Sequence, residues 1–239
     1  MRQVPAPIAV IGMACRFPGA PDPEAFWRFL LAGSNAIGDA IADRWPDASF
    51  LAESAGRHGA FLENIEMFDA DFFGISPAEA AAMDPQQRLA LELAWEALED
   101  AGIVPARLSG SPTGVFVGAT YDDYAALTLM HGSAAIGRYT MTGSSRAVIA
   151  NRISYQFGFG GPSLAVDSAQ SSSAVAVHAA CESLRASECT LALAGGVNLN
   201  IIPQRAFSAG QFGALSPDGE CFVFEIGRAS CRERVFLSV

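Results

Sequence analysis

Residues 167–173, which read DSAQSSS, form the segment whose residue types and spacing best fit acyl chemistry. The segment separates an apolar run at 163–166, which predicts a strand, from an alanine-rich run at 174–185, which predicts a helix. A strand-to-helix turn often holds a nucleophile, because the first backbone N–H groups of the helix have no intrahelical partner and point toward the turn. The residue at that position is Gln170, and a carboxamide is not a usable nucleophile. The segment therefore has the setting of an acyl-transfer site without the attacking atom.

With cysteine in place of Gln170, the segment resembles the active-site signature of β-ketoacyl synthases, the condensing domains of polyketide and fatty-acid synthases. Other stretches resemble further hallmarks of the ketosynthases of modular polyketide synthases, and they occur in the expected order. These stretches are IAVIGMACRFPG at 8–19, FDADFFGISP at 68–77, MDPQQR at 83–88, LALAGGVN at 191–198 and LSPDG at 215–219. The resemblance covers residues 6–224 and is specific, because several separate blocks carry it.

The resemblance implies a fold of class α/β, the thiolase-like fold with αβαβα layers, of which only the N-terminal half and a little more is present. Expected strands that alternate with expected helices agree with this class. The two catalytic histidines of the family belong to the second half, and none of His58, His131 and His178 lies in a matching motif. The chain is therefore expected to be a fragment that carries part of a site and is inactive alone.

With glutamine at position 170, the segment resembles that of a known subtype of ketosynthases, which is found in loading modules. The resemblance implies decarboxylation of a malonyl or methylmalonyl unit held on the phosphopantetheine of an acyl carrier protein. Loss of CO₂ needs no nucleophile, because it leaves an enolate that hydrogen-bond donors stabilise by roughly 3–4 kcal/mol each. Gln170 is the one catalytic candidate, through its backbone N–H and its side-chain NH₂. Two alternatives stay open: a condensing ketosynthase with an altered residue, and an inactive docking scaffold.

The resemblance also implies a homodimer in which residues 163–166 pair across the two-fold axis. Its expected partners are the acyl carrier protein and acyltransferase domains of the same synthase, with no cofactor bound directly. All 15 basic residues are arginines and the net charge is −10, which disfavours binding to nucleic acid.

Hydropathy and cysteine usage indicate the compartment. No apolar run approaches the length of a membrane span, and the N-terminus lacks the layout of a signal peptide. The five cysteines show no CxxC spacing, which indicates reduced thiols in a cytoplasmic protein. Neither they nor the histidines form a metal-ligand cluster, so no metal is expected.

The last fifteen residues, 225–239, depart from the family pattern, which would continue with an acidic residue and a glycine-rich block. Residues 226–235 resemble a translated DNA-sequencing adapter. We therefore treat 1–224 as the ketosynthase-like domain and 225–239 as a non-native tail. The alternative is a genuine basic C-terminal helix.

Capping residues and periodicity place the other elements. Asp22 is expected to cap a helix that has Pro23 at its first position and 25–31 inside it. Ser76 and Glu79 form a capping box, and Asp84 opens a longer helix that ends at Gly102. The core-facing stripe of the longer helix comprises Leu91, Ala94, Trp95, Leu98 and Ala101. Strands are expected at 8–14, 113–119 and 191–199, the first buried and the last central, with a helix and a glycine-rich turn over 142–161.

Several other residues receive structural rather than chemical interpretations. His178 is expected to be a core or interface histidine, and Cys181 and Cys189 are expected to be buried thiols. The serines at 171–173 begin the helix, since no GxSxG turn surrounds them. The acidic pair at 122–123 is expected to lie in a solvated loop.

Overall fold

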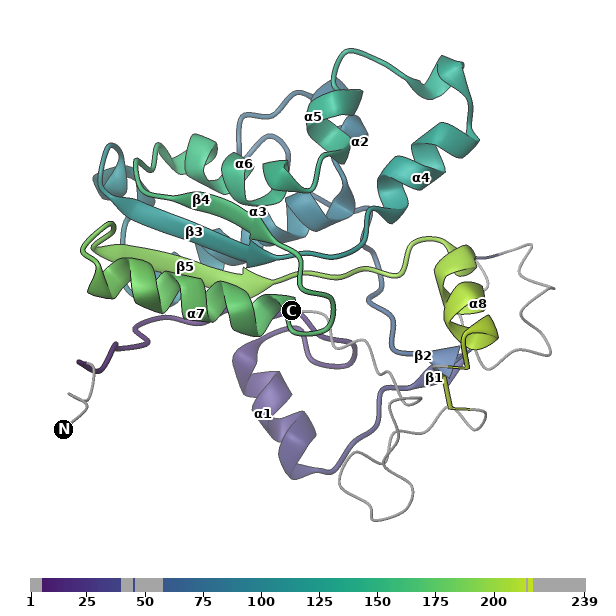
Figure 1. Ribbon diagram of the computed structural model, residues 1–239, viewed down its shortest axis with the longest axis horizontal. Helices are drawn as coiled ribbons and strands as arrows, with labels where there is room; N and C mark the ends of the chain where they lie inside the picture. The colour runs from purple at the N-terminus through teal and green to yellow at the C-terminus, as the bar shows by residue number, and fades with distance from the viewer. Residues whose placement is uncertain (1–5, 40–44, 46–57, 214, 217–239) are drawn as a thin grey trace.

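A three-stranded parallel sheet forms the centre of the structure. The computed structural model describes residues 6–39, 45, 58–213 and 215–216. Strand β3 (Thr113–Gly118) pairs with β4 (Ser163–Val166) on one side and with β5 (Leu191–Gly196) on the other. The strands are parallel, so their carboxyl ends lie together along one edge of the sheet, which we call the carboxyl edge (Figure 1).

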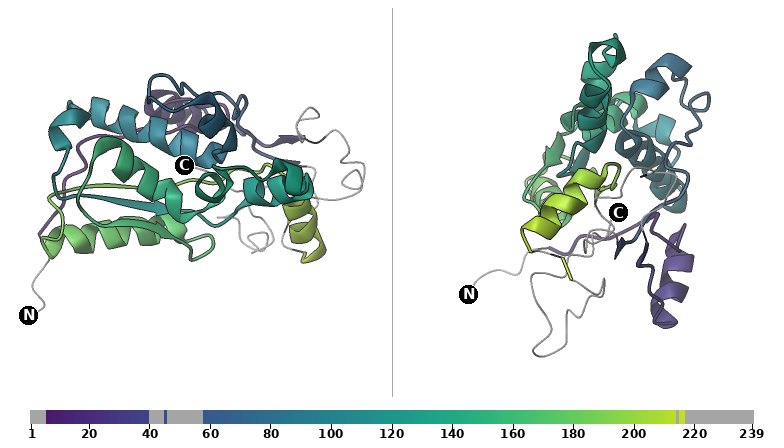
Figure 2. Two further views of the ribbon diagram at one scale, coloured as in Figure 1. Left: turned by 90° about the horizontal axis from the view of Figure 1, so that it is seen from above. Right: turned by 90° about the vertical axis from the view of Figure 1, so that its right-hand side faces the viewer.

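Helices cover both faces of this sheet. Helix α7 (Ser172–Arg185) packs on one face, and α6 (Ala147–Phe157) packs on the other with α3 (Pro85–Asp100) behind it. Figure 2 shows α3 and α7 on opposite sides of the strands. The alternation of side chains along β3 serves both layers: Val115 and Val117 join the main core, while Phe116 packs against α7. The helix–sheet–helix arrangement confirms the α/β class.

The predicted helix starts are confirmed by their caps. The carboxylate of Asp22 accepts the Ala25 N–H at 2.7 Å at the start of α1 (Pro23–Leu31). The hydroxyl of Ser76 accepts the Glu79 N–H at 3.3 Å at the start of α2 (Pro77–Ala82). In α3 Leu91 and Leu98 of the predicted stripe are almost completely buried, whereas Ala101 lies beyond the end of the helix and is only partly buried.

The other elements are shorter or lie around the sheet. They are β1 (Gly38–Asp39), β2 (His58–Gly59), η3 (Pro105–Leu108), α4 (Asp123–Met130), η4 (Ser133–Ala135), α5 (Thr140–Ser144) and α8 (Pro203–Gln211). No helix in the part of the chain that the structure describes is long and apolar enough to cross a membrane.

Two strand predictions were wrong. Residues 8–14 are not a buried strand: they pair with no strand among the described residues, and Val10 is 78% exposed. Strand β5 is not central among the described residues, since β3 lies between it and β4. Helices cover both faces of the sheet, and this gives an edge strand the same apolar pattern as a central one.

The helix expected within 142–161 is interrupted. Residues Ser145 and Arg146 separate α5 from α6, and Gly158 then ends α6 in the left-handed conformation. Residues 217–239 lie outside the described part of the chain, so the boundary at 224 and the interpretation of the tail stay predictions.

Candidate active site

The turn that follows β4 lies at the carboxyl edge and leads directly into α7. Ala169, immediately before Gln170, has a φ of 56°, in the left-handed region that L-residues rarely adopt. Gln170 is exposed, and its carboxamide makes no hydrogen bond to any residue that the structure describes. The structure therefore places the predicted catalytic residue on an exposed, strained turn with its side chain available for contact.

The serines of the segment hold this turn in shape. The hydroxyl of Ser172 accepts the Ser168 N–H at 2.9 Å and donates to the Ala169 carbonyl at 2.5 Å. Ser171 donates its hydroxyl to the Ser168 carbonyl at 2.9 Å. These hydroxyls are occupied by the backbone, which agrees with their interpretation as residues that begin the helix.

Two glycines let the first turn of α7 rest directly on the sheet. A Cβ on Gly118, at the end of β3, would lie 2.5 Å from the backbone of Ser172 and Ser173. A Cβ on Gly196, at the end of β5, would lie 2.7 Å from the Cβ of Ser173. The N-terminus of α7 therefore reaches the carboxyl edge only because these positions lack side chains.

Replacement of Gly118 with alanine is expected to push α7 away and to lower the free energy of unfolding by about 1–3 kcal/mol. Gly195→Ala is the matched control, because a Cβ at Gly195 meets no described atom within 4 Å. Urea unfolding of both variants checks the prediction, and equal midpoints would contradict it.

The MDPQQR stretch forms a buried polar network behind the carboxyl edge. Gln86 Nε2 donates to Asp84 Oδ2 at 3.2 Å and to the Tyr121 carbonyl at 3.1 Å, and its Oε1 accepts the Leu199 N–H at 3.3 Å. The start of α3 is thereby tied to the segments that follow β3 and β5. Its neighbour Gln87 donates from Nε2 to three backbone carbonyls around α5.

The sequence predicted that Asp84 begins a helix here, which the structure confirms, but not the buried hydrogen bonds of Gln86 and Gln87. The available signal was a run of polar residues at the start of a helix whose remaining stripe is apolar. The interpretation of 122–123 as a solvated loop was wrong for Asp123, which is 1% exposed. Its carboxylate accepts the N–H groups of Ile201 and Ile202 and the Nε–H of Arg205.

Burial raises the pKa of Asp84 from its usual 3.8 to about 6, and the nearby carboxylate of Asp123 adds to this effect against the Gln86 donors. Because the folded pKa is the higher one, the folded state binds the proton more tightly than the unfolded state. The contribution of Asp84 to stability therefore falls as pH rises from about 4 to about 6, by on the order of 3 kcal/mol.

Asp84→Asn is expected to remove this titration. The free energy of unfolding of the native protein should fall relative to that of the variant between pH 4 and pH 6.5. Urea unfolding at both pH values measures the difference between the two proteins. A difference that does not change with pH would contradict the expectation.

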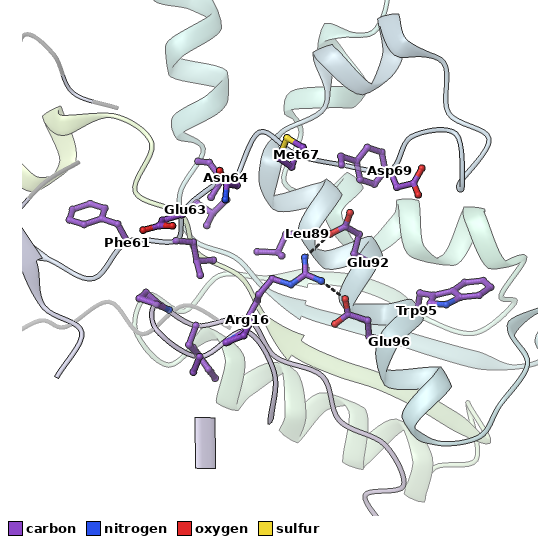
Figure 3. Close-up of a pocket in the computed structure, with 18 of the residues that line it drawn as sticks. Arg16, Phe61, Glu63, Asn64, Met67, Asp69, Leu89, Glu92, Trp95 and Glu96 are labelled. Carbon is purple, nitrogen blue, oxygen red and sulfur yellow. Dashed lines mark hydrogen bonds and ion pairs between the residues drawn. The ribbon is translucent and has the colours of Figure 1, made fainter. Parts of the chain in front are cut away.

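The described residues also form a cavity between residues 16–21, residues 61–73 and helix α3 (Figure 3). It has a volume of about 900 Å³ and lies beside α3, where Arg16 bridges Glu92 and Glu96. No residue of 167–173 lines it, and its described lining contains no serine, cysteine or histidine. We therefore do not assign acyl chemistry to this cavity.

The histidines and cysteines that the sequence analysis discussed are distributed over several parts of the structure. His178 is exposed on α7 and so is not a core residue, while His131 caps α4. Cys189 is buried as predicted, but Cys181 is only partly buried. His58 lies in β2. The three histidines thus belong to different elements, and His178 is the one on the helix that follows the turn.

Comparison with known proteins decides the family. The family described as "Beta-ketoacyl synthase, N-terminal domain" matches residues 6–228. The chain belongs to this β-ketoacyl synthase family. The chain is 56% identical over 225 residues to the polyketide synthase GfsA of Streptomyces halstedii, covering 92% of this chain and 3% of that protein. It is 47% identical over 230 residues to one of the phenolphthiocerol/phthiocerol polyketide synthase proteins of Mycobacterium tuberculosis (strain CDC 1551 / Oshkosh), covering 93% of this chain and 15% of that protein.

Solved ketosynthases have the same fold. The OzmH KS7 domain from the oxazolomycin synthase of Streptomyces albus JA3453 has a TM-score of 0.82 at 39% identity, over 91% of this chain and 38% of that one. The ketosynthase of module 6 of the bacillaene synthase from Bacillus subtilis 168 has a TM-score of 0.77 at 36% identity, over 89% and 35%. These neighbours confirm the N-terminal half of a thiolase-like fold. The chain spans little more than a third of the length of these solved chains.

Proposed function

We propose that this ketosynthase chain is the N-terminal part of a loading-module decarboxylase that acts on malonyl- or methylmalonyl-acyl carrier protein. The observation that carries the proposal is Gln170, which stands on the strained turn before α7 where a nucleophile would stand. The matched family is one of condensing transferases of polyketide synthases.

The reaction requires charge stabilisation rather than covalent attack. The bond between the carboxylate carbon and the α-carbon breaks, and CO₂ leaves. The electron pair of that bond stays on the α-carbon and forms an enolate with negative charge on the thioester oxygen. The α-carbon then takes a proton to give the acetyl or propionyl thioester. A backbone N–H at residue 170 and the Gln170 NH₂ are donors that can face the enolate oxygen.

The arrangement of α7 supports this assignment. Gly118 and Gly196 let the helix N-terminus reach the carboxyl edge, so the positive end of the helix dipole lies beside residue 170. Positive potential there favours the enolate without any acyl-enzyme intermediate. The second half of the domain would supply the catalytic histidines.

The surface of the described residues supports a larger assembly. Strand β4 is an edge strand whose Leu164 is 49% exposed, which suits pairing with a second copy in a homodimer. The acyl carrier protein and acyltransferase domains of the same synthase are the proposed partners, in the cytoplasm. Exposed Val10 and Ile11 lie on a surface that the rest of the domain would cover. The family's catalytic histidines would come from the same part, so the fragment alone is expected to be inactive.

The test uses a protein that carries the whole ketosynthase domain, with malonyl-acyl carrier protein as substrate. Release of CO₂ with no acyl adduct on the domain supports the decarboxylase. An adduct at residue 170 with chain extension would instead establish the condensing alternative. Neither activity would identify a docking scaffold.

A further inference from the structure

Arg146 lies in the interruption between α5 and α6, and its side chain reaches the carboxyl edge. Its Nη1 donates to the Thr120 carbonyl and to Asp167 Oδ2, both at 2.6 Å. Thr120 follows β3 and Asp167 follows β4. A single nitrogen of Arg146 therefore joins the start of α6 to two segments at the carboxyl edge.

The two partners of Arg146 hold Ala169 from both sides. Asp167 Oδ1 accepts the Ala169 N–H at 3.1 Å, and the Thr120 hydroxyl donates to the Ala169 carbonyl at 3.3 Å. Ala169 is the left-handed residue of the turn, and its conformation persists only where the surroundings hold it. The direction in which residue 170 projects follows from that conformation.

The carboxylate of Asp167 stays charged in this arrangement. The Ala169 N–H, and then the hydrogen bond from Arg146, hold the pKa of Asp167 below its usual value. The Arg146 and Asp167 side chains are 38% and 43% exposed, and ion pairs this exposed add little to the stability of a fold. The contacts of Arg146 are therefore suited to set geometry more than to hold the domain together.

We propose that Arg146 is a positioning residue of the acyl site, which fixes Ala169 through Asp167 and Thr120 and thereby aims residue 170 at the substrate. This inference rests on the proposed function only in taking residue 170 as the group that faces the thioester. It does not depend on whether the native protein decarboxylates its substrate.

The test uses a protein that carries the whole ketosynthase domain and the change Gln170→Cys, so that a covalent readout exists. The probe is an acetyl thioester of N-acetylcysteamine, and mass spectrometry follows acetylation of the introduced cysteine. Addition of Arg146→Ala is expected to slow acetylation roughly 10- to 100-fold, because the cysteine is no longer held in the orientation that attack on the thioester requires. The rate of alkylation of the same cysteine by iodoacetamide, a small reagent that requires no fixed orientation of the thiol, should change less than about twofold.

Matched variants separate positioning from a general loss of structure. Arg146→Lys should restore most of the rate, because both hydrogen bonds come from one nitrogen and an ammonium can donate both. Asp167→Asn should slow acetylation, and the double variant should be no slower than Arg146→Ala alone, since both act through one set of contacts. Arg185→Ala is the control, because Arg185 pairs with Glu182 at the far end of α7.

An acetylation rate that Arg146→Ala leaves within twofold would overturn the inference, whatever the native protein does with a malonyl thioester. Equal slowing by Arg146→Ala and Arg146→Lys would overturn it as well. If Arg146→Ala lowers the unfolding midpoint, the acetylation rates of the Arg146→Lys and Asp167→Asn variants decide whether Arg146 acts by positioning. Arg146-dependent acetylation beside a native protein that releases no CO₂ would support the inference and refute the proposed decarboxylase.

Discussion

Gln170→Cys is expected to create a residue that becomes acylated, in a protein that carries the whole ketosynthase domain. Native protein incubated with an acyl thioester should show no adduct at residue 170, whereas the variant should form a thioester there. The introduced thiol would lie at the N-terminus of α7, where the helix dipole lowers the pKa of a cysteine and stabilises its thiolate.

Intact-protein and peptide mass spectrometry measure this outcome. The peptide map must place the adduct at residue 170, because Cys181 on α7 is only partly buried. Gln170→Ser is the matched control: a serine hydroxyl at the same position is far less ionised than a thiol and should acylate much more slowly. An adduct on native Gln170 itself would refute the proposed chemistry, and no adduct on the cysteine variant would show that the turn does not face a thioester.

The sequence predicted the local features of this site because they depend on residues close together in the chain. The caps provided by Asp22 and Ser76 need only the first turn of their own helices. The strand, turn and helix around Gln170 were predicted for the same reason. The exposed, left-handed turn at Ala169 could not be predicted, because glycine would have been the ordinary signal for it.

The polar contacts that support the site could not be predicted, since their partners are far apart in the sequence. Gln86 binds the backbone of Tyr121 and Leu199, and Asp123 binds residues that follow β5. A carboxylate in a loop is usually solvated, and only the fold shows that segments after two strands converge on it. The pairing of Arg146 with Asp167 is of the same kind.

The same limit applies to the strands. Whether β5 lies at the centre or at an edge depends on its neighbours, and an apolar run reports only that both of its faces are covered. Exposed Val10 shows the converse, since a strand-like apolar sequence forms no strand where no partner strand lies beside it among the described residues.

Gln170→Ala is expected to lower malonyl-carrier decarboxylation by about 10²-fold or more if the side-chain NH₂ binds the enolate oxygen, because removal of one such donor has this effect on acyl-transfer enzymes. Decarboxylation by Gln170→Glu should be slower still, since glutamate has nearly the shape of glutamine but places a negative charge next to the developing enolate. Arg185→Ala, at the far end of α7, should leave the rate unchanged. The rate of CO₂ release under single-turnover conditions orders the variants, with binding of the carrier protein measured separately. If the Gln170→Ala variant and the native protein release CO₂ at the same rate, the backbone N–H stabilises the enolate. The carboxamide then serves only to exclude a nucleophile.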